Sequence, residues 1–259
     1  MNKYKGYLID LDGTIYQGSK KIPAAKRFIE RLQKDKIPFL FVTNNTTKQP
    51  IDVVENLAVN HDINVSVNNV YTAGQATAEF LSADAEKHKR NQTAYVIGEN
   101  GLKALLTKAD FDLYSDNPDY VVVALDYDVT YHKLATAVLE VQKGAHFIGT
   151  NADSLIPSEK GMLPSAGSIV DLVRYATKVD PVIVGKPNNL IIENAIKKIN
   201  LPAKDVVMVG DNYDTDILAG INAKIDTLLV YSGVSKPDVI KDKKIKPTNE
   251  IKSLDDWKL

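Results

Sequence analysis

The chain of 259 residues contains no cysteine. This absence excludes disulfide bonds, thiolate metal sites and catalysis by a cysteine nucleophile, so any metal ion must be bound through oxygen or histidine. The sequence also lacks an apolar run of the roughly 20 residues that cross a bilayer, and its N-terminal apolar run is too short for a signal peptide. We therefore expect a cytoplasmic protein without a membrane as partner.

The sequence also has no large excess of positive or negative charge. The 32 basic and 33 acidic side chains give a formal net charge of −1, which removes the electrostatic case for nucleic acid as the main partner. With 44% hydrophobic and 25% charged residues, the chain has the composition of a globular protein with a substantial core. A homo-oligomer is compatible with this composition.

Short apolar segments alternate with longer amphipathic ones, which predicts an α/β fold with a mostly parallel sheet. Residues 82–93 are almost wholly polar, which fits either a solvated helix end or a domain boundary, and a second α/β pattern begins at residue 94. We expect a core formed by residues 1–82 and 181–259, with residues 83–180 as a separate domain. The same patterns predict helices at 75–81 and 214–221, a loop-rich stretch at 149–167 and a core strand at 182–184.

Two carboxylates follow the first predicted strand. Asp10 and Asp12 are separated by one residue, so in strand geometry their side chains point the same way just beyond the sheet. Gly13 allows a tight turn and Thr14 can donate a hydrogen bond, which would let this loop receive a divalent cation and an anion. An ordinary Asp-Gly turn is the alternative, and this motif alone does not decide between them.

Two further motifs follow predicted core strands. Thr43-Asn44-Asn45 offers a hydroxyl, side-chain amides and free helix-start N–H groups to an anion, although ordinary helix capping would explain these residues too. Lys186 stands between a glycine and a proline, where its charge could neutralise a phosphate or an aspartyl phosphate. A lysine at the surface is the alternative.

A fourth motif places Asp211, Asp214 and Asp216 within six residues between a strand and a helix. Such a density of carboxylates suits a hard cation such as Mg²⁺, and helix capping makes Asp214 the weakest candidate ligand.

All four motifs lie at the C-terminal ends of predicted core strands, where open parallel sheets bind ligands. Their shared location favours one site, and their side chains are those that phosphoryl transfer requires.

These residues, in their order and spacing, resemble the motifs of the haloacid dehalogenase superfamily of phosphatases. The resemblance rests on Asp10-Leu11-Asp12-Gly13-Thr14, Thr43, Lys186, and Gly210-Asp211 with Asp216. Through Gly149-Thr150-Asn151-Ala152-Asp153 and the loop that follows, the whole chain is similar to the NagD-like branch. This similarity implies a Rossmann-like parallel-sheet core with an α/β cap inserted between the second and third motifs.

The resemblance also implies a role for each carboxylate. Asp10 would attack phosphorus and form an aspartyl phosphate, and Asp12 would protonate the leaving oxygen and later activate water. Mg²⁺ would bind the Asp10 carboxylate, the Asp12 backbone carbonyl and Asp211. Asp216 would hold metal-bound water or orient Lys186.

The remaining residues would bind substrate. Thr43 and Asn44 would take phosphate oxygens, and Lys186 would stabilise the charged intermediate. We expect substrate selection in the cap loop, at Thr150, Asn151 and Asp153.

The function expected from the sequence is a Mg²⁺-dependent phosphatase acting on a small phosphate monoester, such as a nucleotide, a sugar phosphate or a related metabolite. A phosphotransferase or mutase of the same superfamily is an alternative, because the same intermediate could pass to an alcohol. A non-enzymatic receiver module with a phosphorylated aspartate is a second alternative. A receiver has no use for an inserted domain of about a hundred residues or for an acid two residues after the acceptor.

Overall fold

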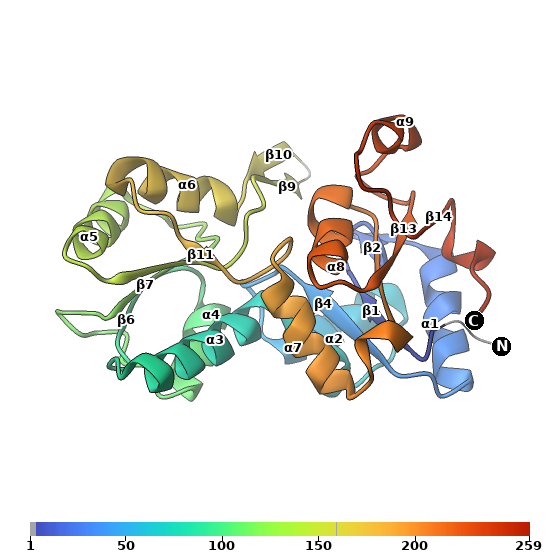
Figure 1. Ribbon diagram of the computed structural model, residues 1–259, viewed down its shortest axis with the longest axis horizontal. Coiled ribbons are helices and arrows are strands. Elements are labelled where there is room, and N and C mark those ends of the chain that lie inside the picture. Colours follow the sequence, from blue (N-terminus) through green and yellow to red (C-terminus); the bar gives the residue numbers. More distant parts are fainter. Residues whose placement is uncertain (1–3, 159) are drawn as a thin grey trace. The chain divides into compact units, whose positions relative to one another are not determined.

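The computed structural model describes residues 4–158 and 160–259, and the chain separates into two compact units (Figure 1). The first unit contains the described residues up to Thr43 together with Pro50–Tyr71 and Lys186–Leu259. The second contains Asn44–Gln49 and Thr72–Gly185. No helix in the described part of the chain combines the length and apolarity needed to cross a membrane.

A six-stranded sheet forms the centre of the first unit. Strand β1 (Gly6–Ile9) lies between β12 (Val206–Gly210) and β4 (Phe39–Thr43), and it is parallel to both. The carboxyl ends of these three strands therefore meet at one edge. The sheet continues through β5 (Val70–Thr72) on one side and through β13 (Asp226–Val230) and β14 (Asn249–Ile251) on the other.

Helices cover both faces of this sheet. Ile9 of β1 packs in one apolar cluster with Phe28 of α1 (Pro23–Lys34) and Leu57 of α2 (Pro50–His61). Because alternate strand residues point to opposite faces, the neighbouring positions face the other layer. There α7 (Asn189–Ile199) contacts β1, β4 and α8 (Leu218–Asn222). Helix α9 (Pro237–Lys241) and a hairpin of β2 (Tyr16–Gln17) and β3 (Lys20–Lys21) complete this unit.

The second unit is built on a smaller parallel sheet with the order β11-β8-β7-β6. The strands of this sheet are β6 (Ala94–Ile97), β7 (Tyr120–Val123), β8 (His146–Gly149) and β11 (Val182–Ile183). The helices of the second unit are α3 (Ala73–His88), α4 (Asn100–Lys108), α5 (Tyr131–Gln142) and α6 (Ala166–Thr177). Two parallel sheets with helices confirm the α/β class expected from the sequence.

Some segments differ from the sequence-based expectation. Helix α3 runs unbroken to His88, across the expected domain edge at residues 82–83, and Ala85, one turn after Leu81, is the buried residue in this polar part of the helix. Strand β11, expected in the core, pairs with β8 of the second unit, with Val182 opposite Ile148.

The loop-rich stretch at 149–167 contains an antiparallel hairpin of β9 (Leu155–Ser158) and β10 (Gly161–Pro164). The helix expected at 214–221 begins with a π-helical turn at Tyr213–Ile217 and continues as α8. In this turn the Ile217 amide reaches back five residues to the Asn212 carbonyl at 3.3 Å.

Candidate active site

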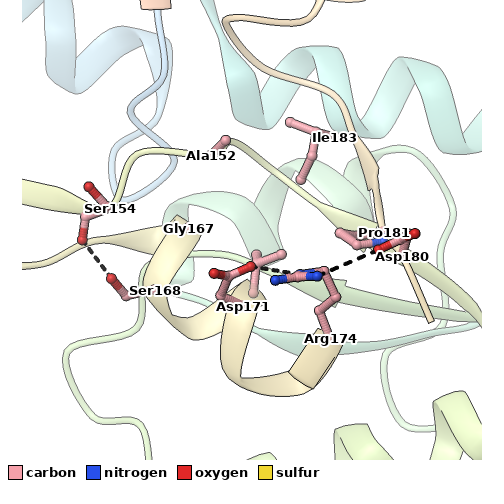
Figure 2. Close-up of a pocket in the computed structure, with 10 residues that line it drawn as sticks. Ala152, Ser154, Gly167, Ser168, Asp171, Arg174, Asp180, Pro181 and Ile183 are labelled. Atoms are coloured by element: carbon pink, nitrogen blue, oxygen red, sulfur yellow. Dashed lines mark hydrogen bonds and ion pairs between the residues drawn. The ribbon is translucent and has the colours of Figure 1, made fainter. Parts of the chain in front are cut away.

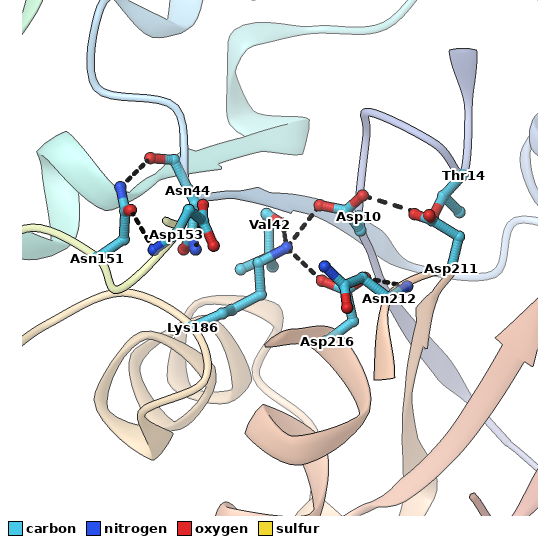
Figure 3. A network of polar contacts seen from close by, with 10 residues as sticks. All are labelled: Asp10, Thr14, Val42, Asn44, Asn151, Asp153, Lys186, Asp211, Asn212 and Asp216. Atoms are coloured by element: carbon cyan, nitrogen blue, oxygen red, sulfur yellow. Dashed lines mark hydrogen bonds and ion pairs between the residues drawn. The ribbon is translucent and has the colours of Figure 1, made fainter. Parts of the chain in front are cut away.

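Three buried carboxylates meet at the C-terminal edge of the large sheet (Figure 3). Asp10 follows β1, whereas Asp211 and Asp216 follow β12. One ligand oxygen from each lies within 4.8 Å of the other two. The side chains that the sequence placed at the ends of two different strands are thus brought together.

Lys186 holds this group from the side of α7. Its Nζ donates to Asp10 Oδ1 at 2.5 Å, to Asp216 Oδ1 at 2.7 Å and to the Val42 carbonyl at 2.9 Å. The lysine is 1% exposed, so these three acceptors replace the water that its ammonium would otherwise bind. Lys186 therefore joins the ends of β1, β4 and β12 through one buried charge.

Burial and mutual repulsion dominate the electrostatics of the cluster. The pKa of Asp10 lies well above its usual range, because burial and the charges of Asp216 and Asp211 outweigh the charge of Lys186. Burial and Asp216 raise the pKa of Asp211 to about 6. Burial would lower the pKa of Lys186, but the charges of Asp10 and Asp216 outweigh it and raise that pKa. The ionised cluster thus carries more negative charge than the lysine balances.

The donor set fits a divalent cation. Three carboxylates and one ammonium, when all are ionised, leave two negative charges uncompensated in a buried site. Carboxylate oxygens are the ligands that Mg²⁺ prefers, and a cation would remove the penalty that raises these pKa values.

Thr14 and two glycines shape the space around Asp211. Thr14 Oγ1 donates to Asp211 Oδ1 at 3.0 Å. Gly13 has a φ of +96° that L side chains rarely adopt, and a Cβ built on Gly13 would lie 2.4 Å from Asp211 Oδ2. A Cβ on Gly233 would lie 2.0 Å from the same oxygen. Only glycine lets these two backbones approach the carboxylate so closely.

The loop after β13 was missed by the sequence analysis. The Val234 amide donates to Asp211 Oδ2 at 2.7 Å, and the Ser232 hydroxyl donates to the Gly13 carbonyl at 2.6 Å. The Ser235 hydroxyl accepts from the Tyr213 amide at 2.8 Å. This loop also follows a core strand, and that position was the signal that could have identified it.

Asp12 lies outside the carboxylate cluster. Its Oδ1 accepts from the Gly18 amide at 3.3 Å, and the residue is exposed. Partial desolvation of the carboxyl raises the pKa of Asp12, although the Gly18 hydrogen bond opposes this shift. A carboxyl with a raised pKa holds its proton more readily, which suits a general acid.

Two other motif residues differ in their surroundings. Thr43 is buried at the end of β4, directly after the residue whose carbonyl binds Lys186. Asp214 is exposed and pairs with Lys243 at 2.6 Å, so its carboxylate is engaged outside the cluster. The cap of this turn is Asn212, whose Oδ1 accepts from the Asp214 amide at 3.0 Å.

Asn44, Asn151 and Asp153 form a polar network within the second unit (Figure 3). Asn44 Nδ2 donates to Asp153 Oδ2 at 3.0 Å, and Asn151 Nδ2 donates to the Asn44 carbonyl at 3.0 Å. Asn151 Oδ1 accepts from the Asp153 amide at 3.1 Å. Thr150 is fully buried, and its amide donates to the Val123 carbonyl at 3.0 Å. Their roles with substrate stay predictions.

A pocket of about 320 Å³ also lies in the second unit, beside α6 (Figure 2). Arg174 in its wall pairs with Asp171 at 2.8 Å and with Asp180 at 3.8 Å. Two carboxylates offset the charge of this arginine, so the pocket offers little attraction to a phosphate. We therefore do not assign a phosphate site to it.

Known proteins share both the sequence and this arrangement. A family model described as haloacid dehalogenase-like hydrolase matches residues 7–112, and a second HAD-hydrolase-like model matches residues 183–257. NagD from E. coli K-12 is 31% identical, with a TM-score of 0.91 over 99% of both chains. The chain belongs to the haloacid dehalogenase-like hydrolases. Within them it is a NagD-like phosphatase, as the motif resemblance indicated.

Two curated relatives carry more specific names. The chain is 43% identical to the 5'-nucleotidase YutF of Bacillus subtilis, over 99% of this chain and 98% of that protein. It is 46% identical to an acid sugar phosphatase of Staphylococcus epidermidis, over 98% of this chain and 96% of that protein. Relatives of comparable similarity are thus named for different phosphate esters.

Proposed function

We propose that this NagD-like phosphatase hydrolyses a small phosphate monoester with Mg²⁺ through an aspartyl-phosphate intermediate. The observation that carries the proposal is the buried group of Asp10, Asp211 and Asp216, in which Lys186 bridges two of the three carboxylates. This group combines a nucleophile, cation ligands and a fixed positive charge at one sheet edge.

The first half of the reaction transfers the phosphoryl group to the enzyme. A carboxylate oxygen of Asp10 forms a bond to phosphorus while the bond between phosphorus and the ester oxygen breaks. The proton of the Asp12 carboxyl passes to that oxygen, which leaves as an alcohol. The raised pKa of Asp12 supports this role, because it increases the protonated fraction near neutral pH.

The second half returns the enzyme to its starting state. The Asp12 carboxylate accepts a proton from water, and the resulting hydroxide oxygen bonds to phosphorus as the bond to Asp10 breaks. Inorganic phosphate is released, and Asp12 is again protonated. One carboxyl therefore serves as acid and then as base.

The cation and the surrounding side chains would offset the negative charge of the phosphate and of the nucleophile. Asp10, Asp211 and the Asp12 backbone carbonyl would hold Mg²⁺, with Asp216 binding its water or orienting Lys186. Bound Mg²⁺ offsets charge on phosphate and nucleophile together. Thr43 and Asn44 take phosphate oxygens, and Lys186 stabilises the phosphorylated Asp10.

The second unit acts as the cap that selects the ester, and the substrate is a small metabolite. Thr150, Asn151 and Asp153 are its proposed specificity residues. The polar network that Asn151 and Asp153 form with Asn44 supports the proposal for those two. Relatives named as a 5'-nucleotidase and as an acid sugar phosphatase make nucleotides and sugar phosphates the first candidates. Location in the cytoplasm and assembly into oligomers stay predictions.

The test is a panel of nucleotides, sugar phosphates and other phosphorylated metabolites, assayed for phosphate release with and without Mg²⁺. We expect repeated turnover with Mg²⁺ only, and no turnover by Asp10→Asn. Labelled phosphate should appear on the wild-type chain during turnover and be absent from Asp10→Asn. Appreciable activity of Asp10→Asn would remove Asp10 as the nucleophile. Product that retains the phosphate on a second alcohol would favour a phosphotransferase or mutase, and a single turnover would favour a receiver.

A further inference from the structure

The β2–β3 hairpin contacts the carboxyl that the proposed function uses as acid and base. Its turn presents the Gly18 amide to Asp12 Oδ1 at 3.3 Å. Asp12 also forms a β-bridge with Tyr16, and the Gly13 amide donates to the Tyr16 carbonyl at 2.6 Å. The orientation of the Asp12 carboxyl therefore depends on the position of this hairpin.

The hairpin needs external support, because each strand has only two residues and an isolated hairpin of this size is unstable in water. The support comes from the end of α2. The ring of His61 stacks on the ring of Tyr16, with centroids 4.4 Å apart and planes at 12°. Lys21 Nζ pairs with Asp62 Oδ2 at 2.5 Å. His61, the last residue of α2, thus holds β2, and the next residue, Asp62, holds β3.

The end of α2 is itself fixed to the core. Asp62 adopts a left-handed φ of 56°, and the Ile63 amide donates back to the Leu57 carbonyl at 3.0 Å. These features end the helix at a left-handed residue and connect the following residue back to the last turns of α2. Ile63 and Leu57 are both buried in the main apolar cluster. His61 and Asp62 therefore have a rigid base from which to hold the hairpin.

We propose that His61 and Asp62 are positioning residues for Asp12. They hold the hairpin so that the Gly18 amide keeps the Asp12 carboxyl in the orientation that proton transfer requires. His61 acts through its packed ring, which is 3% exposed, and not through contact with substrate. This inference rests on the proposed function, in which Asp12 protonates the leaving oxygen.

The leaving group provides a readout that a purely structural role would not change. An alkyl phosphate releases a strongly basic oxygen and needs the proton of Asp12, whereas p-nitrophenyl phosphate releases a weakly basic phenolate and needs it far less. The ratio of kcat/KM for the two esters therefore reports how well Asp12 acts as an acid. A smaller fraction of folded enzyme lowers both values by the same factor and leaves the ratio unchanged.

We expect His61→Ala to lower kcat/KM for an alkyl phosphate about tenfold more than for p-nitrophenyl phosphate, because small displacements of a catalytic group are costly. His61→Phe keeps a flat ring against Tyr16 and should keep the wild-type ratio. Asp62→Asn tolerates the left-handed φ and removes the charge of an exposed ion pair, so it should shift the ratio in the same direction by a smaller factor. Its exposed side chain also makes it the deciding variant if His61→Ala does not fold.

Two reference variants complete the experiment. Trp257→Ala removes a ring that stacks on Tyr4 at 6.2 Å outside the hairpin, and it should leave the ratio unchanged. Asp12→Asn removes the acid itself and should give the largest change in the ratio of kcat/KM for the two esters. An unchanged ratio in folded His61→Ala and Asp62→Asn, beside a clear shift in Asp12→Asn, overturns this inference and leaves the proposed function in place. An unchanged ratio in Asp12→Asn overturns the acid role of Asp12, and the inference with it.

Discussion

The Thr14 hydroxyl donates to the Asp211 carboxylate at 3.0 Å, and this hydrogen bond joins two loops whose residues are 197 positions apart in the sequence. Both side chains are buried, so neither group can exchange this bond for one with bulk water. The bond lowers the pKa of Asp211 against the effect of burial. Thr14 therefore helps to keep a proposed cation ligand ionised.

Replacing Thr14 by valine should weaken Mg²⁺ binding about tenfold, which is the usual effect of removing a residue that supports a metal ligand. The loss of the donor raises the pKa of Asp211, so protons compete better with the cation. Calorimetric titration with Mg²⁺ at pH 7 measures the effect. Thr14→Ser keeps the hydroxyl and should bind as the wild type does. Equal affinity in the valine variant would contradict this account.

Asp12→Asn should slow both formation and breakdown of the phosphorylated enzyme, each by about 100-fold, because one carboxyl supplies the proton and later removes one. Rapid-quench measurements with labelled substrate separate the two steps. A change confined to formation would leave Asp12 as an acid only. Unchanged rates in both steps would end its proposed role.

Lys186→Met should destabilise the cation-free protein by about 3 kcal/mol, since it leaves buried carboxylates without their ammonium partner. Urea unfolding with and without Mg²⁺ measures this, and Mg²⁺ should restore more stability to the variant than to the wild type. Lys243→Met is the matched control, because it breaks the Lys243–Asp214 ion pair and should cost less than about 1 kcal/mol. Equal losses in the two variants would be inconsistent with a central role for Lys186.

The raised pKa of Asp211 predicts how the binding of Mg²⁺ depends on pH. Protons and cations compete for this carboxylate, so Mg²⁺ affinity should fall as pH decreases through about 6. For the cation-free protein, the stability should depend on pH with the opposite sign to that given by an aspartate whose pKa is lowered on folding. The folded state binds more protons than the unfolded state between the ordinary pKa of 3.8 and about 6, so this group costs stability as pH rises through that window.

Melting temperatures recorded with and without Mg²⁺ at pH 5 and pH 7.5 test this prediction. The shift caused by Mg²⁺ should be larger at pH 7.5. Thr14→Val should move the dependence to higher pH, which ties the effect to Asp211. A Mg²⁺ effect that is independent of pH would count against Asp211 as a ligand.

Asp153→Ala should change the preference between a nucleotide and a sugar phosphate while leaving Mg²⁺ affinity unchanged. The substitution removes the acceptor of the Asn44 side-chain amide and leaves the proposed cation ligands unchanged. Ratios of kcat/KM over the substrate panel provide the measurement. Asp171→Ala, which breaks an exposed ion pair elsewhere in the second unit, should leave every ratio as in the wild type. Identical ratios in both variants would rule out a role for Asp153 in selection.

The parts of the fold that were predictable from the sequence have local signals. Buried strands such as β12 are short apolar runs, and polar residues at their ends indicate the ligand-binding edge without knowledge of the pairing. The hairpin of β9 and β10 has no such signal, because all four residues of β10 are exposed and alternation is lost. The polar half of α3 agrees with the solvated helix end that the sequence allowed, since Ala85 is its one buried residue after Leu81.

Some residues of the site can likewise be identified from their neighbours in the sequence, whereas others depend on contacts between distant segments. Asp211 and Lys186 carry charge beside glycine, and Asp10 carries charge directly after an apolar strand, so their chemistry is visible in the sequence. Val234 contributes only its backbone amide to Asp211, and any residue type but proline supplies that donor. The stacking of His61 on Tyr16 depends on the packing of α2, which the sequence pattern around either residue does not contain.

The chain passes between its two units at four peptide bonds, and two of them adjoin residues proposed to bind phosphate: Thr43 precedes one passage and Lys186 follows another. Exchange of the second unit for that of a related enzyme therefore requires junctions that adjoin proposed phosphate-binding residues. A chimaera with two of its four junctions directly after Thr43 and before Lys186 would place foreign backbone beside both residues, whereas junctions moved a few residues into the second unit would preserve their native neighbours. Engineering of new substrate ranges in this scaffold should begin from the latter design.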